Sequence, residues 1–230
     1  MGQGDPKQAV PVIAIDGPGG SGKGTLALLL AQRLGWHLLD SGALYRLVAV
    51  AAMDRGIAAD DGPALGRLAA GLDVDFGVAA SGMVVRLEGL DITDRLRSED
   101  VSAFSSRVAA CPEVRAALVR LQRAFREPPG LVADGRDMGT VIFPDARLKI
   151  FLTASAEARA ARRHKQLKEK GENVNLSRLF QEIERRDDRD RSRAISPLVP
   201  ASDAHLVDST ELSIDDVLHK ILKLLEESNI

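Results

Sequence analysis

Cysteine, aromatic residues and long apolar runs are all scarce in this chain of 230 residues. The single cysteine, Cys111, excludes an internal disulfide framework and suits a reducing compartment. No apolar stretch reaches the ~18 residues that a membrane-spanning helix needs, and residues 1–8 lack the apolar segment of a signal peptide. A formal net charge of −2 gives no bulk attraction to nucleic acid. These absences predict a cytoplasmic protein whose partners include neither a membrane nor a nucleic acid.

What the sequence does contain is an alternation of apolar runs and helical patterns. Short, nearly continuous apolar runs are typical of parallel strands that helices cover on both faces. The alternation therefore predicts an α/β fold with a parallel sheet. The expected strands are residues 12–15, 37–39, 131–133, 148–152 and 205–207. The expected helices of this core are residues 24–34, 44–55, 156–170, 176–190 and 214–227.

Residues 73–94 interrupt the alternation. Three short runs joined by glycine turns predict a small antiparallel meander there, and helical patterns follow at 98–110 and 113–126. A Pro-Pro-Gly turn then leads back to the strand that ends near Asp134. We therefore expect a flexible N-terminus at residues 1–9 and an insert at residues 61–129. The core would consist of residues 10–60 and 130–230.

A glycine-rich segment lies directly between the first strand run and the first helical pattern. Glycines let successive backbone N–H groups converge on one point, and a helix N-terminus adds the positive end of its dipole. Lys23 adds a mobile positive charge at the expected offset. The arrangement predicts a binding site for the phosphates of a nucleoside triphosphate. Its residues are Gly17, Pro18, Gly19, Gly20, Ser21, Gly22, Lys23, Gly24 and Thr25.

This loop predicts binding but leaves the reaction open. In the strict G-x-x-x-x-G-K-[S/T] pattern, the hydroxyl that ligates Mg²⁺ follows the lysine directly, whereas here Gly24 stands in that position. We therefore expect Mg²⁺ to be held largely through water and phosphate oxygens, with no protein side chain as its ligand. The sequence also lacks an Asn-Lys-x-Asp guanine motif. These departures favour a small-molecule kinase over a switch or a motor.

Charged segments at the ends of predicted strands indicate an acceptor site. Asp40 and Ser41 end the second strand run, and residues 134–140 read Asp-Gly-Arg-Asp-Met-Gly-Thr at the end of the third. Parallel sheets bind ligands beyond the carboxyl ends of their strands, where the phosphate loop also lies. An ordinary helix cap is the alternative for Asp40 and Ser41. For residues 134–140 we favour a functional role.

Arginines rather than histidines dominate the remaining candidates. Arg186, Asp190 and Arg193 are spaced to share one helical face, although charge runs usually form solvated ion pairs. Phosphoryl transfer depends on positioning and on neutralising charge, and a phosphate acceptor is already ionised and needs no general base. The pattern therefore fits a phosphate acceptor. An alcohol acceptor, with Asp40 or Asp134 as base, is the competing interpretation.

Four segments together resemble the bacterial cytidylate kinase family: residues 17–25, 39–46, 133–141 and 186–191. The resemblance extends from about residue 10 to residue 225. It implies a nucleoside monophosphate kinase fold with a five-stranded parallel sheet, flanking helices, a monophosphate-binding insert and a lid at about residues 155–175. It also implies an enzyme that transfers the γ-phosphoryl group of ATP to CMP or dCMP with Mg²⁺. Separately, we expect a monomer, although the sequence does not itself give the oligomeric state. Gly19 departs from the family, which often has serine there.

The resemblance further implies a role for each matching residue. The Asp137 carboxylate would accept a hydrogen bond from the cytosine amine and repel the uracil carbonyl. The acceptor phosphate would be bound by Ser41, Arg46, Arg136 and Arg193. The base would be read by Ser106, Arg115 and Asp137, and the ribose would be contacted by Arg186 and Asp190. The catalytic set would be Lys23, Arg136, Arg186 and Arg193, with the lid arginine left open among Arg159, Arg162 and Arg163.

Two alternatives to this reaction stay open. One is a P-loop kinase for a different monophosphate or a small alcohol, which the preference for the acceptor base would reveal. The other is a sensor that binds ATP and a pyrimidine monophosphate without turnover. The intact Lys23 and the full set of arginines argue against a sensor.

Overall fold

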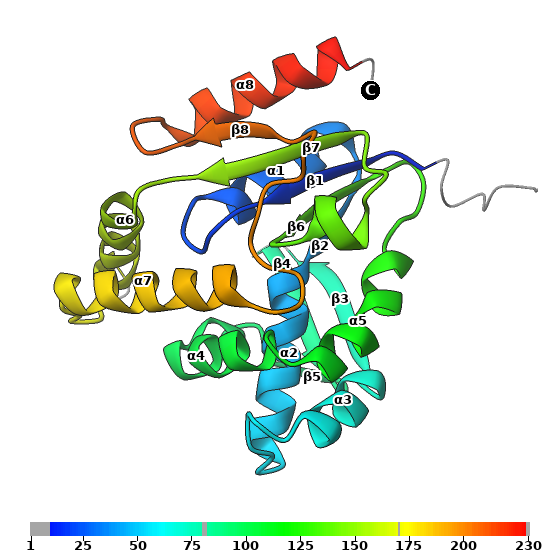
Figure 1. Ribbon diagram of the computed structural model, residues 1–230, viewed down its shortest axis with the longest axis vertical. Helices are drawn as coiled ribbons and strands as arrows, with labels where there is room; N and C mark the ends of the chain where they lie inside the picture. Colours follow the sequence, from blue (N-terminus) through cyan, green and yellow to red (C-terminus); the bar gives the residue numbers. More distant parts are fainter. Residues whose placement is uncertain (1–9, 80–81, 170, 229–230) are drawn as a thin grey trace, which may run out of the picture. The chain divides into compact units, whose positions relative to one another are not determined.

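A computed structural model describes residues 10–79, 82–169 and 171–228. A parallel sheet of five strands has the order β2-β6-β1-β7-β8 (Figure 1). Its register places Asp16, at the end of the central strand, beside Gly135 on one side and Phe151 on the other. The strands are β1 (Val12–Asp16), β2 (His37–Asp40), β6 (Leu131–Gly135), β7 (Leu148–Thr153) and β8 (His205–Asp208). The predicted α/β fold with a parallel sheet is confirmed.

Apolar side chains from the sheet and from two helices form the main core. Helix α1 (Lys23–Leu34) contributes Leu26 and Leu30, and α8 (Ile214–Glu227) contributes Val217 and Ile221. Every residue of β1 is buried, which explains its nearly continuous apolar sequence. This packing fixes the carboxyl end of β1, from which the glycine-rich loop leaves the sheet.

The chain divides into two compact units: residues 1–40 with 123–230, and residues 41–122. The first unit contains the parallel sheet together with α1, α6 (Ala156–Glu169), α7 (Leu176–Ser192) and α8. Within it, α6 and α7 pack against each other (Figure 1). The expected roles of residues 61–129 as an insert and of 155–175 as a lid stay predictions. The flexible N-terminus expected at residues 1–9 lies outside the described residues.

The second unit is built from helices and a small antiparallel sheet. Its strands, in the order β3-β4-β5, confirm the meander predicted at residues 73–94. The strands are β3 (Val74–Ala79), β4 (Gly82–Leu87) and β5 (Leu90–Asp91). The helices are α2 (Ser41–Asp54), α3 (Gly62–Ala70), the 3₁₀ turn η2 (Arg95–Arg97), α4 (Glu99–Val108) and most of α5 (Pro112–Ala124).

Three short elements were not predicted from the sequence: α3, the turn η2 and a π-helical turn. Helix α3 has only nine residues and begins where the Asp61 carboxylate accepts a hydrogen bond from Ala64 N. A single π-helical turn, η3 (Met138–Ile142), follows β6 directly. Isolated π turns occur often at functional sites, so η3 directs attention to the residues that flank it.

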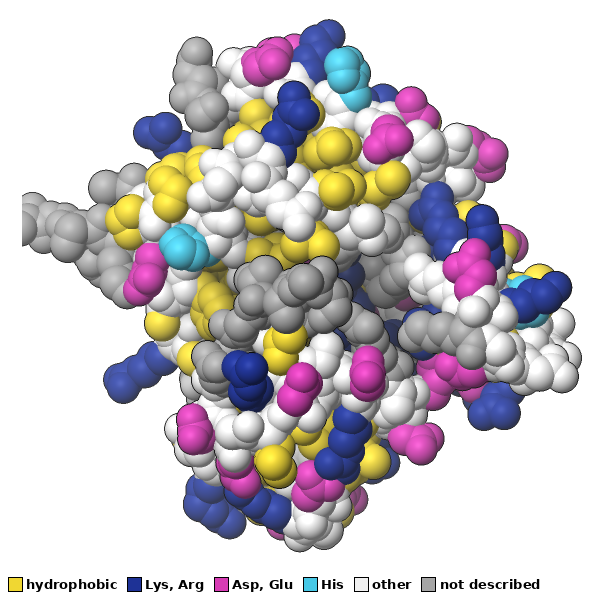
Figure 2. Space-filling view, turned by 180° about the vertical axis from the view of Figure 1, so that it is seen from behind, with side chains coloured by type: hydrophobic (Ala, Val, Ile, Leu, Met, Phe, Trp, Pro, Cys, Tyr) yellow, Lys and Arg dark blue, Asp and Glu magenta, His cyan; other side chains and the backbone are white. Residues whose placement is uncertain are grey.

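The surface is mixed in charge. Figure 2 shows acidic and basic side chains intermingled over one face of the molecule, in keeping with the formal net charge of −2. None of the helices within the described ranges combines the length and the apolar character that crossing a bilayer requires.

Candidate active site

The glycine-rich loop connects β1 to α1 through backbone conformations that side chains rarely adopt. Gly17 has φ 152°, and a Cβ atom there would lie 2.0 Å from the carbonyl oxygen of Leu152. Gly22 has φ 96° and precedes the first helical residue, Lys23. No side chain caps this helix start in the described structure. Its N–H groups and the positive end of its dipole therefore form a site for an anion, as the sequence predicts.

Lys23 lies at the base of this loop and is buried. Its Nζ atom is 3.6 Å from Oδ1 of Asp134, at the end of β6. The pKa of Lys23 is lowered to about 8, chiefly by burial and also by the positive charges of Arg136 and Arg186, while the Asp134 carboxylate opposes the shift. An anionic ligand would stabilise the charged form of the lysine.

Two arginines flank the same loop. A Cβ atom on Gly19 would lie 3.3 Å from Nη2 of Arg136 and 3.6 Å from Cζ of Arg186. Both guanidinium groups therefore lie against the backbone of the loop, together with Lys23. A serine in place of Gly19 would contact both arginines.

Asp190 holds this cationic cluster in place from α7. Its Oδ2 atom accepts a hydrogen bond of 2.8 Å from Nε of Arg136, and its backbone carbonyl accepts one of 3.3 Å from Nε of Arg193. Burial raises the pKa of Asp190, but the charges of Arg136 and Arg186 outweigh it, so the net shift is downward. Asp190 is therefore an ionised anchor for the arginines. The first unit thus brings together Lys23, Arg136, Arg186, Asp190 and Arg193.

Asp137 is buried at the point where β6 passes into η3. The next two residues, Met138 and Gly139, donate their backbone N–H groups to the carboxylate of Asp16. Burial is the main cause that raises the pKa of Asp16 to about 7. The sequence analysis missed Asp16, although a carboxylate that ends a fully apolar strand run was a visible signal.

The other predicted residues belong to the second unit. Ser41 and Arg46 lie on α2, Ser106 on α4 and Arg115 on α5. The Arg115 guanidinium lies 5.5 Å from the centroid of the Tyr45 ring, and its Nη1 atom donates to the carbonyl oxygen of Ala109 at 3.0 Å. Ser41, Ser106 and Arg115 are buried, and Arg46 is half-buried.

Two of the three candidate lid arginines are tied to the backbone of the glycine-rich loop. Arg159 donates to the Gly19 carbonyl at 3.1 Å and forms a bidentate ion pair with Asp187 at 3.1 and 2.5 Å. Both of these side chains are almost fully buried. Arg162 donates to the carbonyl of Ser21 and to that of Ser209.

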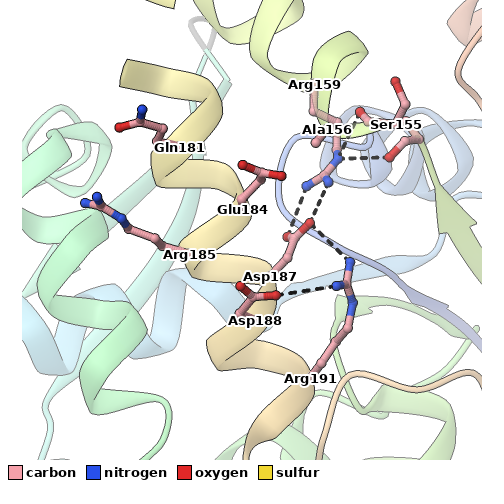
Figure 3. A pocket seen from close by; sticks show the side chains of 10 residues that line it. Ser155, Ala156, Arg159, Gln181, Glu184, Arg185, Asp187, Asp188 and Arg191 are labelled. Atoms are coloured by element: carbon pink, nitrogen blue, oxygen red, sulfur yellow. Dashed lines mark hydrogen bonds and ion pairs between the residues drawn. The ribbon is translucent and has the colours of Figure 1, made fainter. Parts of the chain in front are cut away.

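A cavity of about 450 Å³ opens beside the Arg159–Asp187 pair (Figure 3). Figure 3 shows Asp187 directed from α7 toward Arg159, with Arg191 reaching both Asp187 and Asp188. The Arg159 side chain thus contacts the glycine-rich loop, the start of α6 and the charged face of α7. Among the described residues, no group of three or more His, Cys, Asp or Glu side chains is placed to hold a metal ion.

Comparisons of this sequence with a family model and with known proteins point to the same family. The family model described as cytidylate kinase matches residues 13–227. A protein named cytidylate kinase from Aeromonas hydrophila is 59% identical over 220 residues, which are 96% of each chain. A cytidylate kinase from Stutzerimonas stutzeri is 60% identical over 96% of this chain and 97% of its own. One from Pseudomonas aeruginosa is 60% identical over 95% of this chain and 96% of its own.

Proposed function

Because the chain belongs to the cytidylate kinase family, we propose which of its residues carry each part of that family's reaction. The enzyme transfers the γ-phosphoryl group of ATP to CMP and forms CDP and ADP. The observation that carries the assignment is the convergence of Lys23, Arg136 and Arg186 on the glycine-rich loop. Three cations at one helix start suit a reaction in which charge on phosphate oxygens must be neutralised.

ATP is held by residues 17–25. The backbone N–H groups of the loop and the start of α1 bind its phosphates, and Lys23 stabilises the charge on the phosphoryl group in transfer. The hydrogen bonds from Arg159 and Arg162 to loop carbonyls keep the loop in its binding conformation. Preorganised donors cost no rearrangement when the reaction occurs.

The acceptor phosphate is bound by Arg136 and Arg193 from the first unit and by Ser41 and Arg46 from the second. Asp190 orients Arg136 through its carboxylate and contacts the ribose together with Arg186. No general base is needed, because the attacking phosphate oxygen is already ionised. The arginines act by orienting this oxygen in line with the γ-phosphorus atom and by screening the repulsion between the two phosphates.

The cytosine base is read by Asp137, with Ser106 and Arg115 from the second unit. The carboxylate of Asp137 accepts a hydrogen bond from the exocyclic amine of cytosine, and the carbonyl of uracil at the same position would be repelled. A buried charge without its donor is costly, so UMP is expected to be a poor acceptor. Ser106 and Arg115 belong to residues 61–129, to which we assign the role of a monophosphate-binding insert.

The local chemistry also fits Mg²⁺, which binds through oxygen atoms. Gly24 offers no hydroxyl, and a Cβ atom there would lie 3.2 Å from Oδ2 of Asp134, so a carboxylate occupies this place beside the helix start. We assign the ion to water and the ATP phosphates, with no protein side chain as its direct ligand. When bound, Mg²⁺ neutralises charge on the phosphate oxygens.

The assay that tests this assignment measures ADP production from Mg-ATP with CMP, dCMP, UMP and AMP as separate acceptors. We expect fast turnover with CMP and dCMP and little with UMP or AMP. A reaction without acceptor measures background ATP hydrolysis. Binding of ATP and CMP without turnover would support a sensor, and turnover only with another monophosphate or a small alcohol would overturn the assignment of the base-reading residues.

Three further details belong to the same proposal. The chain acts as a monomer of 24.7 kDa, which light scattering after gel filtration tests directly. Residues 155–175 act as a lid that closes over ATP. The location is cytoplasmic, as expected from a single cysteine and no disulfide framework.

A further inference from the structure

Asp16 is a buried carboxylate to which the proposed reaction assigns no task. It is the last residue of β1, directly before Gly17 of the glycine-rich loop, and only 4% of it is exposed. A carboxyl group in such a place is costly unless hydrogen bonds compensate for the lost water. The role of Asp16 therefore depends on what its two oxygen atoms contact.

Both oxygen atoms accept hydrogen bonds from the backbone of η3. Oδ1 accepts from Met138 N and Oδ2 from Gly139 N, each at 2.8 Å. These two N–H groups belong to the first residues of a helical turn, which have no intrahelical acceptor. Without Asp16 they would be buried donors in need of another acceptor. The carboxylate therefore determines where the chain runs directly after Asp137.

Lys149 fixes the same backbone from another side. A Cβ atom on Gly139 would lie 3.1 Å from Cδ of Lys149 and 3.4 Å from Oδ2 of Asp16. The lysine is itself held by Asp203, at 2.8 and 3.0 Å, and by the Pro144 carbonyl at 2.6 Å. Residue 139 thus has close neighbours on two sides, and the backbone around it has little freedom to shift.

We propose that Asp16 is a positioning residue for cytosine recognition, acting through the backbone of Met138 and Gly139 on the side chain of Asp137. The proposal rests on the role assigned above to Asp137. Because Asp16 also adjoins Gly17, one carboxylate links the loop that binds ATP to the segment that reads the base. A small shift of Asp137 would weaken its hydrogen bond to cytosine, since such bonds depend strongly on distance and angle.

Asp16→Asn is the sharpest variant because it preserves the shape of the side chain. The amide has one acceptor oxygen, and its NH₂ group would face the second backbone N–H. We expect kcat/KM for CMP to fall about tenfold, mainly through KM, because one well-oriented hydrogen bond is disturbed. The KM for ATP should change less than about twofold, and the preference for CMP over UMP should fall by about the same factor as kcat/KM for CMP.

A double-mutant cycle separates this role from the role of Asp137. We expect Asp137→Asn to abolish the preference for CMP over UMP, and Asp16→Asn to reduce it no further in that background. An unchanged preference in Asp137→Asn alone overturns the assignment of Asp137 as base reader, and with it the path by which Asp16 would act. If Asp137→Asn loses the preference for CMP over UMP but Asp16→Asn keeps it, the role of Asp16 alone is overturned. The same conclusion follows if the effects of the two substitutions on this preference are additive in the double variant.

Val12→Ala is the matched control for a simple loss of stability, because Val12 is fully buried on the same strand but lies at its opposite end, paired with Leu131. It should lower the midpoint of urea unfolding and leave the CMP preference unchanged. If Asp16→Asn fails to fold, Gly139→Ala crowds the same segment, because its Cβ atom would lie 3.4 Å from Oδ2 of Asp16 and 3.1 Å from Cδ of Lys149, and it retains the carboxylate. A lower CMP preference in Gly139→Ala supports the proposal, and an unchanged preference contradicts it.

Discussion

At the scale of single residues, the buried lysine makes ATP binding sensitive to pH. The pKa of Lys23 lies at about 8 because the side chain is buried among arginines, so the free enzyme loses this charge as the pH rises through that value. We expect the Kd for ATP to increase by about tenfold between pH 7 and pH 9.5, since a charge-assisted hydrogen bond is lost. Isothermal titration across this range measures it.

Lys23→Arg provides the control, because a guanidinium stays charged throughout the range. Its Kd for ATP should show no break near pH 8. A break of the same size in both proteins would assign the pH dependence to another group.

Titration of Asp16 makes the free energy of unfolding depend on pH. Its pKa is raised from 3.8 to about 7 by burial, so between these values the native protein holds a proton that the unfolded chain has released. The contribution of Asp16 to the free energy of unfolding therefore falls as the pH rises from about 4 to about 7, and is constant above that. A shift of this size corresponds to at most about 4 kcal/mol.

Urea unfolding at pH 5 and pH 7.5 tests this sign in the parent protein and in Asp16→Asn. We expect the variant to lose less stability between the two pH values than the parent does, since its amide does not titrate. Equal losses in the two proteins would show that Asp16 is ionised throughout the range. The other carboxyl groups are shared by both proteins and cancel in the comparison.

At the scale of secondary structure, sequence patterns predicted the elements whose signals are local. The helix predicted at residues 214–227 has those bounds in the structure, because Ser213 and Asp216 form a capping box and an apolar stripe follows. Strands β1, β6 and β7 were recognisable because buried parallel strands are nearly all apolar, whereas the edge strands β2 and β8 are more exposed and gave only short apolar runs. In contrast, α3 is short, and η3 depends on backbone N–H groups that donate hydrogen bonds to Asp16, which is over 120 positions away in the chain. No local pattern contains such a contact.

The Arg159–Asp187 ion pair is the clearest link between elements in the first unit. It joins α6 to α7, and Arg159 also binds the Gly19 carbonyl of the glycine-rich loop. Asp187→Ala should reduce the free energy of unfolding by about 3 kcal/mol, because a buried guanidinium would lose its counter-charge. Urea unfolding measures this loss.

The adjacent residue, Asp188, offers a matched control. Its side chain is 78% exposed and pairs with Arg191 at 3.7 Å, whereas that of Asp187 is only 4% exposed. Asp188→Ala should change stability by less than about 0.5 kcal/mol, as is usual for exposed pairs. Similar losses in both variants would contradict the view that burial of the pair determines its contribution.

At the scale of the whole molecule, the residues proposed for the site belong to both compact units. The sequence could place residues on elements: Arg136 after β6, Arg186 and Asp190 on α7, Arg46 on α2. The resemblance to a family was needed to single out Ser106 and Arg115, because they occur within ordinary helical patterns. Physical reasoning recovers the anion site of the first unit from its glycines, lysine and arginines. The residues of the second unit that we propose as acceptor contacts have no comparable local signature.

Because the proposed ATP and CMP contacts include residues of different units, we expect ATP and CMP to stabilise the protein through different residues. Lys23 belongs to the first unit and Arg46 to the second. A ligand at 100 times its Kd adds about 2.7 kcal/mol to the free energy of unfolding, which corresponds to a rise in Tm of roughly 5–10 °C for a chain of this size. Lys23→Met should reduce the rise caused by ATP and preserve the rise caused by CMP. Arg46→Gln should reduce the rise in Tm caused by CMP and preserve the rise caused by ATP in the same thermal scans. Loss of both rises in either variant would mean that the two ligands do not bind independently.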